Sequence, residues 1–341
     1  MIDYLLAKNV LPDGVVRFGI RNLLKQRINE DIGKSETEKK EKKHSFVTRQ
    51  KSYNKIAVQT QEANEQHYEV PTEFYHLCLG TRKKYSCCYY NTFEETLDEA
   101  EVIMLEKTVA NAQLSDGMEI LELGCGWGSL TLFMAEKFPN AKITAVSNSK
   151  TQKEFIDNTA KEKGFQNITV ITCDINDFSI DKKFDRVVSV EMFEHMRNYE
   201  MLLNKVTGFL KDNGKIFVHI FTHKDVPYFF DVKDESDWMS KYFFSGGIMP
   251  SSDIFNYYSD IVKVVDQKKI NGKHYAQTSE QWLEKMDQNK DEIMALFKKH
   301  YGNEAKKWFS YWRIFYMSCA ELWKYKDGEE WYVSHYLMEK A

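Results

Sequence analysis

The sequence predicts an α/β fold: a mostly parallel sheet with helices on both faces, a helical arm before it and a helical cap after it. Three observations support this fold. Between residues 114 and 224, short apolar segments alternate with helical ones, which is typical of a parallel sheet. A glycine run, residues 124–128, follows the first apolar segment. After residue 225 the alternation stops, and aromatic residues and Met become frequent, as in a cap over the strand ends.

The 341 residues suffice for one large domain with additions or for two modest domains. We expect three parts. Residues 1–113 form an N-terminal helical region, residues 114–224 form a ligand-binding core, and residues 225–341 form a substrate cap whose last strand returns to the core sheet.

Composition excludes several classes of protein. The net charge of −4 leaves no basic excess to neutralise phosphates, so we expect no nucleic-acid partner. The six cysteines form no CxxC pair, the N-terminus lacks the features of a signal peptide, and no apolar run reaches the roughly 18 residues of a membrane span. We therefore expect a cytoplasmic protein, with peripheral contact to a membrane left open.

The arm is predicted over residues 1–31, where Pro12-Asp13-Gly14 interrupts a helical pattern. Two interpretations stay open: a helix packed on the main domain, and an amphipathic helix on a membrane surface. Residues 33–45 are highly charged and hold no large apolar residue, so we expect a solvated linker or an exposed helix there.

The core is predicted to hold five strands. They cover residues 118–123, 142–147, 168–172, 184–190 and 215–221. We expect helices over residues 149–163, which Gly164 would end, and over residues 198–211. Ligands of such a sheet bind at the carboxyl ends of its strands, so the site residues should follow these strands.

The glycine run has the spacing E-x-G-x-G-x-G from Glu122 through Gly124, Gly126 and Gly128. Glycines let the chain turn sharply and approach a ligand, and the next helix offers unpaired N–H groups and a positive dipole end. A dinucleotide fingerprint would require glycine at position 129, which is Ser. The spacing resembles the first motif of class I methyltransferases, whose loop lies under the methionine part of S-adenosylmethionine (SAM), so residues 114–224 are expected to bind SAM.

The second strand is followed by Ser147, Asn148 and Gln152 rather than by the acid that many nucleotide-binding folds place there for the ribose. The ribose would then need neutral partners, and Gln152 offers both donors and an acceptor. After the third strand, Asp174 could accept a hydrogen bond from adenine while Ile175 packs on the ring. Alternatively, Asp174 only caps the strand end.

Three further motifs carry a more specific resemblance. They are His67–Pro71 together with Tyr85–Tyr89, Glu191–Met196, and His274–Thr278. With the glycine run they resemble the cyclopropane fatty acid synthase family over residues 5–338, and within it the coclaurine N-methyltransferase branch. The resemblance implies a Rossmann-like class I methyltransferase fold and SAM as cofactor, with Tyr85 and Ser86 in the cofactor site.

The family contains two chemistries. Its lipid enzymes methylate an alkene and use a bound bicarbonate to remove a proton. The residues around that anion match Cys87, Glu194, His219 and Tyr275, and all four residue types are present. An unsaturated acyl lipid therefore stays open as the methyl acceptor.

Two positions favour the amine branch. The lipid enzymes usually have a small residue at the position of Glu191 and an aliphatic residue at the position of Phe221. In the amine methyltransferases, the residues that act on the substrate match Glu191, Glu194 and His195. A surface loop after the fourth strand is the alternative explanation of this motif.

An amine acceptor would need these groups. An alkylamine with a pKa near that of Lys is neutral to only about one part in a few thousand at pH 7, so a base within hydrogen-bond reach could add about 10²–10⁴-fold in rate. His195 is expected to be that base, because its ordinary pKa lies near working pH. Glu191 and Glu194 would attract the cationic amine and orient the imidazole.

The cap contains an aromatic stripe at helical spacing, which is typical of a buried helix face. Its members are Trp308, Trp312, Phe315, Cys319 and Leu322. The resemblance instead places Tyr311, Trp312 and Phe315 in the substrate wall, where aromatic faces would suit a cationic amine. Both interpretations stay open.

We therefore expect a SAM-dependent methyltransferase whose acceptor is a small amine. Methyl transfer to an unsaturated lipid is the second hypothesis, and a SAM-binding protein without catalysis is the third. His219 and His223 could suggest a metal pair, but no third ligand is evident nearby in the sequence, so we expect no metal.

Overall fold

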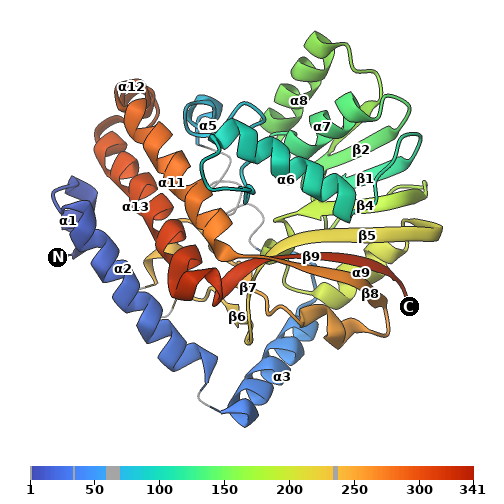
Figure 1. The fold of residues 1–341 in the computed structure, drawn as a ribbon, viewed down its shortest axis with the longest axis horizontal. Coiled ribbons are helices and arrows are strands. Elements are labelled where there is room, and N and C mark those ends of the chain that lie inside the picture. Colours follow the sequence, from blue (N-terminus) through green and yellow to red (C-terminus); the bar gives the residue numbers. More distant parts are fainter. Residues whose placement is uncertain (1, 34, 59–69, 233–236) are drawn as a thin grey trace.

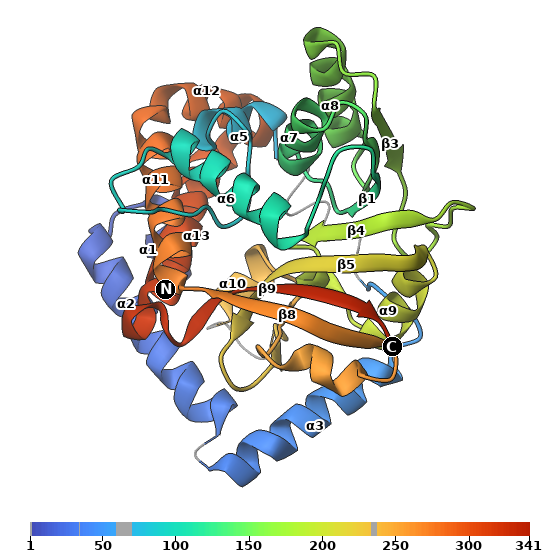
Figure 2. The ribbon, with the colours of Figure 1, turned by 45° about the vertical axis from the view of Figure 1, so that its right-hand side comes forward.

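The computed structural model describes residues 2–33, 35–58, 70–232 and 237–341, and its centre is one seven-stranded sheet (Figures 1 and 2). The strand order is β3-β2-β1-β4-β5-β9-β8; the pairs from β3 to β5 are parallel, and the two pairs that involve β9 are antiparallel. The predicted α/β fold is thereby confirmed. The strands of this sheet are β1 (Glu119–Leu123), β2 (Lys142–Ser147), β3 (Ile168–Thr172), β4 (Phe184–Val190), β5 (Leu210–His223), β8 (Val262–Ile270) and β9 (Trp331–Lys340).

Helices cover both faces of the sheet, because neighbouring residues of a strand point to opposite sides. Ile120 of β1 packs into a cluster with α6 and α7, whereas Leu121 packs into a cluster with α9. The helices around this part of the sheet are α6 (Leu97–Asn111), α7 (Ser129–Lys137), α8 (Lys150–Lys163) and α9 (Tyr199–Thr207).

Two neighbouring predicted bounds were wrong, the end of the helix expected over residues 198–211 and the start of the strand expected over residues 215–221, which begins at Leu210. The helix expected to reach residue 211 ends as α9 at Thr207, because Leu210 already pairs with Phe184 at the start of β5. Strand β8 was not predicted at all. It lies at the edge of the sheet, and its central residues are exposed and charged, which is how natural proteins protect a sheet edge but which removes the apolar signal of a strand.

The cap stands on one side of the sheet and carries the N-terminal helices along its outer face (Figure 1). Arg17 forms a two-bonded ion pair with Glu280 and a further one with Glu321, while Arg313 pairs with Asp13. The arm thus packs on the cap. The elements are α1 (Ile2–Lys8), α2 (Asp13–Arg27), the π-helix η1 (Ile28–Ile32), α11 (Gly272–Gln288), α12 (Lys290–Tyr301) and α13 (Ala305–Lys324).

The charged stretch after the arm is a helix, α3 (Glu36–Ser52), and it begins with a capping box between Ser35 and Glu38. The remaining elements are short. They are α5 (Thr72–Cys78), α10 (Trp238–Tyr242), the two-stranded sheet of β6 (Tyr228–Phe229) and β7 (Ile248–Met249), and the 3₁₀ turns η2 (Phe193–His195), η3 (Ile254–Tyr258), η4 (Gly302–Glu304) and η5 (Tyr325–Gly328).

Among the described residues, no helix combines the length and the apolar character that crossing a membrane requires.

Candidate active site

The glycine loop between β1 and α7 requires glycine at three positions. Gly124, Gly126 and Gly128 have φ of 76°, 51° and 78°, a region that other residues rarely adopt. A Cβ atom on Gly124 would lie 2.8 Å from Met192 Cβ, and one on Gly128 would lie 2.5 Å from Ile156 Cγ1. The loop can therefore make its turn and pack against its neighbours only with glycines.

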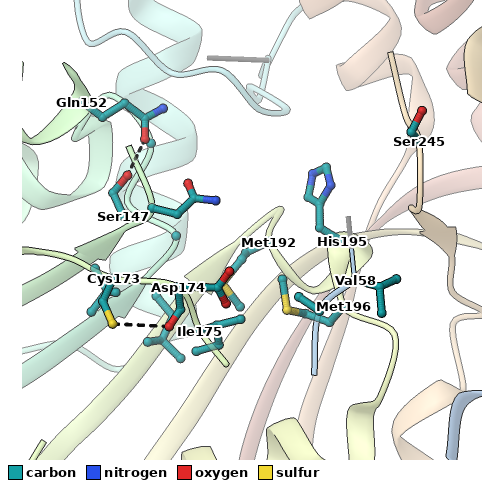
Figure 3. A pocket seen from close by; sticks show the side chains of 16 residues that line it. Val58, Ser147, Gln152, Cys173, Asp174, Ile175, Met192, His195, Met196 and Ser245 are labelled. Carbon is teal, nitrogen blue, oxygen red and sulfur yellow. Dashed lines mark hydrogen bonds between the residues drawn. The ribbon is translucent and has the colours of Figure 1, made fainter. Parts of the chain in front are cut away.

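Two adjoining hollows lie on either side of this loop, and Gly124, Gly126 and Gln152 line both of them. We call them the first and the second lobe; they hold about 780 and 620 Å³ of space open to solvent. Side chains after β2 and β3 line one side of the first lobe, and His195, Met196 and Ser245 line the other (Figure 3).

The first lobe contains all five residues predicted to hold the nucleoside part of a cofactor: Ser147, Asn148, Gln152, Asp174 and Ile175. Gln152 is 1% exposed, and its Oε1 accepts a hydrogen bond from the Ser147 hydroxyl at 2.7 Å (Figure 3). Its Nε2 has no hydrogen-bond partner within the described part of the chain. A buried amide N–H without a partner costs about 1–3 kcal/mol, so this atom suits an oxygen of a bound ligand.

Asp174 has a local role as well as a place in the first lobe. Its Oδ1 accepts hydrogen bonds from the backbone N–H and the side-chain amide of Asn176, at 2.7 and 2.9 Å. This turn fixes the chain after β3 and thereby positions both Asp174 and the buried Ile175 at the cavity.

The second lobe contains Tyr85, Ser86 and Glu122, three further residues that the sequence assigns to the cofactor site, and their role there stays a prediction. It also contains two donors without partners among the described residues, Trp127 Nε1 and the Ser129 hydroxyl. Glu122 accepts a hydrogen bond from the Thr131 hydroxyl at 2.6 Å, and burial raises the pKa of Glu122 to about 8.

Sequence reasoning missed Lys84, which is only 3% exposed and donates a hydrogen bond to the Ser86 hydroxyl in the second lobe. Within the described ranges it forms no ion pair with a carboxylate. A buried ammonium group beside unpaired donors suits an anionic group of a ligand. Its place directly before Tyr85-Ser86 was the signal that could have identified it.

Glu191 follows β4 and is the centre of a buried hydrogen-bond cluster. Its Oε1 accepts from the Cys87 N–H at 3.0 Å and lies 3.2 Å from His219 Nε2, and its Oε2 accepts from the Tyr275 hydroxyl at 2.6 Å. Cys87 precedes α6, His219 lies on β5, and Tyr275 lies on α11. The fold thus brings three distant segments to the carboxylate of Glu191, which lines the second lobe.

The backbone of Glu191 is strained, with φ of 49°. Such a conformation costs a non-glycine residue of order 1–3 kcal/mol and persists only where the surroundings hold it. Burial raises the pKa of Glu191, while the charge of Lys84 and the hydrogen bonds from Cys87 and Tyr275 oppose that rise. A carboxylate held in this way is more basic than an exposed one, and the strain indicates a functional role.

Glu194 and His195 lie in the 3₁₀ turn η2 after Glu191. Glu194 is fully buried, and its Oε1 accepts from the Phe221 N–H at 2.8 Å. Burial and the charge of Glu191 raise the pKa of Glu194 well above its ordinary value, which favours its protonated form. Its predicted role, to attract the amine and orient the imidazole, stays a prediction.

His195 reaches the first lobe, and its ring lies 4.8 Å from that of Phe244. Burial lowers the pKa of His195 to about 4, although the charge of Glu191 opposes the shift. The expectation that this imidazole titrates near working pH is therefore wrong. It is neutral at pH 7, with a lone pair but with weak basicity.

The predicted aromatic substrate residues lie apart from both lobes. Tyr311 donates its hydroxyl hydrogen bond to Asp3 Oδ1 at 2.6 Å, and Trp312 and Phe315 pack on the ring of Phe243. These contacts favour the buried-face interpretation of the stripe, and a role as substrate wall stays a prediction. Phe221 lies between the rings of Phe244 and Trp323, at 5.6 and 5.5 Å.

Residues 67–69 of the first family motif lie outside the described residues. His223 Nε2 lies 3.2 Å from Glu330 Oε1. In the part of the chain that the structure describes, no three His, Cys, Asp or Glu side chains are grouped as metal ligands would be.

Comparison with known proteins shows which family this sequence matches. Residues 56–329 match the family described as mycolic acid cyclopropane synthetase. The chain is 38% identical over 340 residues to an (S)-coclaurine N-methyltransferase of Thalictrum flavum subsp. glaucum, covering 98% of this chain and 94% of the relative. It is 36% identical over 335 residues to an (S)-coclaurine N-methyltransferase of Papaver somniferum, covering 97% and 95%.

A solved structure shows the same fold. It is a crystal structure of coclaurine N-methyltransferase bound to N-methylheliamine and S-adenosylhomocysteine (SAH), with a TM-score of 0.96, 36% identity and 99% of each chain covered.

Proposed function

This chain belongs to the mycolic acid cyclopropane synthetase family and is a SAM-dependent methyltransferase, and we propose that its methyl acceptor is the nitrogen of a small amine. The bound SAM supplies a methyl group on a positively charged sulfur. We propose that Ser147, Asn148, Gln152, Asp174 and Ile175 hold its nucleoside part in the first lobe. The glycine loop, Ser86, Lys84 and Glu122 would hold its methionine part in the second lobe.

One observation supports an amine rather than a lipid. The lipid enzymes of the family surround a bicarbonate with residues that match Cys87, Glu194, His219 and Tyr275. In this chain, three of these residues contact the carboxylate of Glu191 instead: Cys87 through its backbone N–H, and His219 and Tyr275 through their side chains. A fixed carboxylate thus stands where the lipid chemistry would need its anion. A negative side chain there also attracts an ammonium group, whereas a neutral alkene carries no charge for it to attract.

We propose that Glu191 accepts the proton that the amine loses and that His195 orients the nitrogen. Proton transfer from an alkylammonium with a pKa near 10 to an imidazole with a pKa of about 4 would be uphill by about 8 kcal/mol. The buried carboxylate of Glu191, whose pKa is raised, is better matched. The free lone pair then forms the new N–C bond as the S–C bond breaks, leaving SAH.

The test is methyl transfer from radiolabelled SAM to heliamine and to a small panel of secondary and primary amines, with unsaturated phospholipid vesicles in parallel. We expect label in the amines and none in the lipid. Label in phospholipid without any amine product would overturn the proposal.

Lys84 should be needed for binding of the cofactor. Replacing a buried charged hydrogen-bond donor costs about 1.5–3 kcal/mol, so we expect Lys84→Met to weaken the binding of SAH by about 10–100-fold. Titration calorimetry with SAH measures this directly, and Lys137→Met, at a surface ion pair with Glu106, is the matched control. An SAH affinity within twofold of that of the wild type would contradict the role of Lys84.

The pH dependence should identify the groups that exchange the proton. If the ammonium binds to ionised Glu191, kcat/KM reaches a plateau at intermediate pH. It falls at low pH because Glu191 becomes protonated, and it falls at high pH because the free amine loses its proton. We therefore expect the high-pH limb to move when the amine is exchanged for one of lower pKa, while the low-pH limb stays. A high-pH limb that is the same for both amines would contradict this assignment.

A further inference from the structure

A row of buried polar side chains crosses the sheet behind the proposed active site. His219 of β5 and His335 of β9 are direct cross-strand partners, and Lys268 of β8 is the partner of His335 on its other side. Asn111, the last residue of α6, lies over this row. The two imidazoles are 0% and 2% exposed, whereas Lys268 is exposed to solvent.

These side chains form a continuous hydrogen-bond chain that ends on Glu191. Lys268 Nζ donates to Asn111 Oδ1 at 2.9 Å, and Asn111 Nδ2 lies 2.8 Å from His335 Nδ1. His335 Nε2 lies 2.9 Å from His219 Nδ1, and His219 Nε2 lies 3.2 Å from Glu191 Oε1.

The chemistry of the end groups gives the chain one direction. An ammonium group only donates, so the carbonyl of Asn111 faces Lys268 and its NH₂ group faces His335. His335 must then accept at Nδ1, which puts its proton on Nε2, and the same argument applied to His219 puts the proton of that ring on Nε2, facing Glu191. Burial lowers the pKa values of both imidazoles well below the ordinary value, so each carries one proton.

We propose that Asn111 and His335 are positioning residues, which act through His219 to give the carboxylate of Glu191 a fixed donor on the side opposite to the ligand. This inference rests on the role proposed above for Glu191. This row of hydrogen bonds cannot carry the proton of the amine from Glu191 to solvent, because the NH₂ group of Asn111 does not accept a proton at neutral pH. Its function is to hold one tautomer and one orientation.

The first test needs no turnover. In protein labelled with ¹⁵N-histidine, we expect the ring nitrogens of His219 and His335 to show the Nε2–H tautomer in both residues. Asn111→Leu should release this constraint and shift both sets of signals. An Nδ1–H tautomer in either ring of the wild-type protein would overturn the proposal, whatever the methyl acceptor proves to be.

The second test compares two substitutions at one position. His335→Leu breaks the chain, whereas the amide of His335→Gln can accept from Asn111 and donate to His219 without titrating. Since a hydrogen bond to a charged group is worth about 1.5–3 kcal/mol, we expect His335→Leu to lower kcat by about 10–100-fold. Its low-pH limb should also shift to higher pH, because His219 is then no longer held in the tautomer that donates to Glu191.

We expect His335→Gln to retain kcat within about threefold, and the KM for SAM to stay unchanged in both variants. Ser334→Ala is the matched control, because Ser334 is equally buried on the same strand but binds Thr222. If His335→Leu does not fold, Asn111→Leu at the helix end serves in its place. Wild-type kcat in the chain-breaking variant, or a Gln variant as inactive as the Leu variant, would overturn the inference. An inactive wild-type protein with the expected tautomers would count against the proposed function alone.

Discussion

Replacing Glu191 by Gln is expected to lower kcat for amine methylation by about 10²–10⁴-fold, the range typical of a lost proton-transfer group. The amide has the shape of the carboxylate and can still accept from the Cys87 N–H, so the fold should be kept. It cannot take the proton of the amine, and it has no charge to attract an ammonium group. Steady-state kinetics with heliamine, together with SAH binding by calorimetry, separates this loss from a loss of cofactor.

Glu194→Gln is the matched control for this experiment. Burial and the charge of Glu191 raise the pKa of Glu194 and favour its protonated form, which an amide resembles, so we expect a loss of at most about tenfold. An equal loss of kcat in Glu191→Gln and Glu194→Gln would contradict the different roles that we assign to the two side chains.

The backbone at position 191 offers a second control. Because φ is 49° there, Glu191→Gly should be more stable than Glu191→Ala by about 1 kcal/mol, while both lose activity. Urea denaturation of the two variants measures this difference. Equal stability would mean that the position is not strained.

Replacing His195 by Ala is expected to lower kcat by about 10–100-fold, because the amine loses a group that orients it in the cavity. The shape of the pH–rate profile should stay the same, since the pKa of His195 is about 4 and the ring stays neutral between pH 5.5 and 9. Profiles of the wild type and the variant, measured with the same amine, test this.

Loss of the low-pH limb in His195→Ala would contradict this account, because it would make the imidazole the titrating base. Phe244→Leu is a control for the packing around the imidazole of His195, since Phe244 lies beside that ring and has no titratable group.

Much of the fold follows from local sequence patterns. Strands β2, β3 and β4 have the predicted bounds, because each is a short run rich in apolar and β-branched residues; β2 and β4 lie inside the sheet, and β3 lies at its edge. Strand β8 escaped prediction because an edge strand needs no apolar alternation. The boundary between α9 and β5 was misplaced because the pairing of Leu210 with Phe184 ends the helix, and helical periodicity does not include that contact.

The site was predictable where its residues follow strands in order. The glycine loop and Gln152 were expected at a ligand on these grounds, and both line the lobes. The cluster around Glu191 joins segments that are far apart in the sequence, so only the family resemblance could bring them together. The protonation of His195 depends on burial, which the sequence does not contain, and this is why the expected pKa was wrong.

The aromatic stripe illustrates a further limit. Helical spacing indicates that one face of a helix is covered, but it does not identify what covers it. In this protein Phe243 packs on Trp312 and Phe315, and Asp3 of the N-terminal helix accepts from Tyr311.

The most direct test of the central claim is a crystal structure of the protein with SAH and an N-methylated amine product. We expect the ammonium nitrogen within about 3.2 Å of a Glu191 oxygen, the range of a charged hydrogen bond, while Cys87, His219 and Tyr275 keep their contacts with that carboxylate. A nitrogen bound by Glu194 alone, or a bicarbonate among Cys87, His219 and Tyr275 with Glu191 displaced, would contradict it.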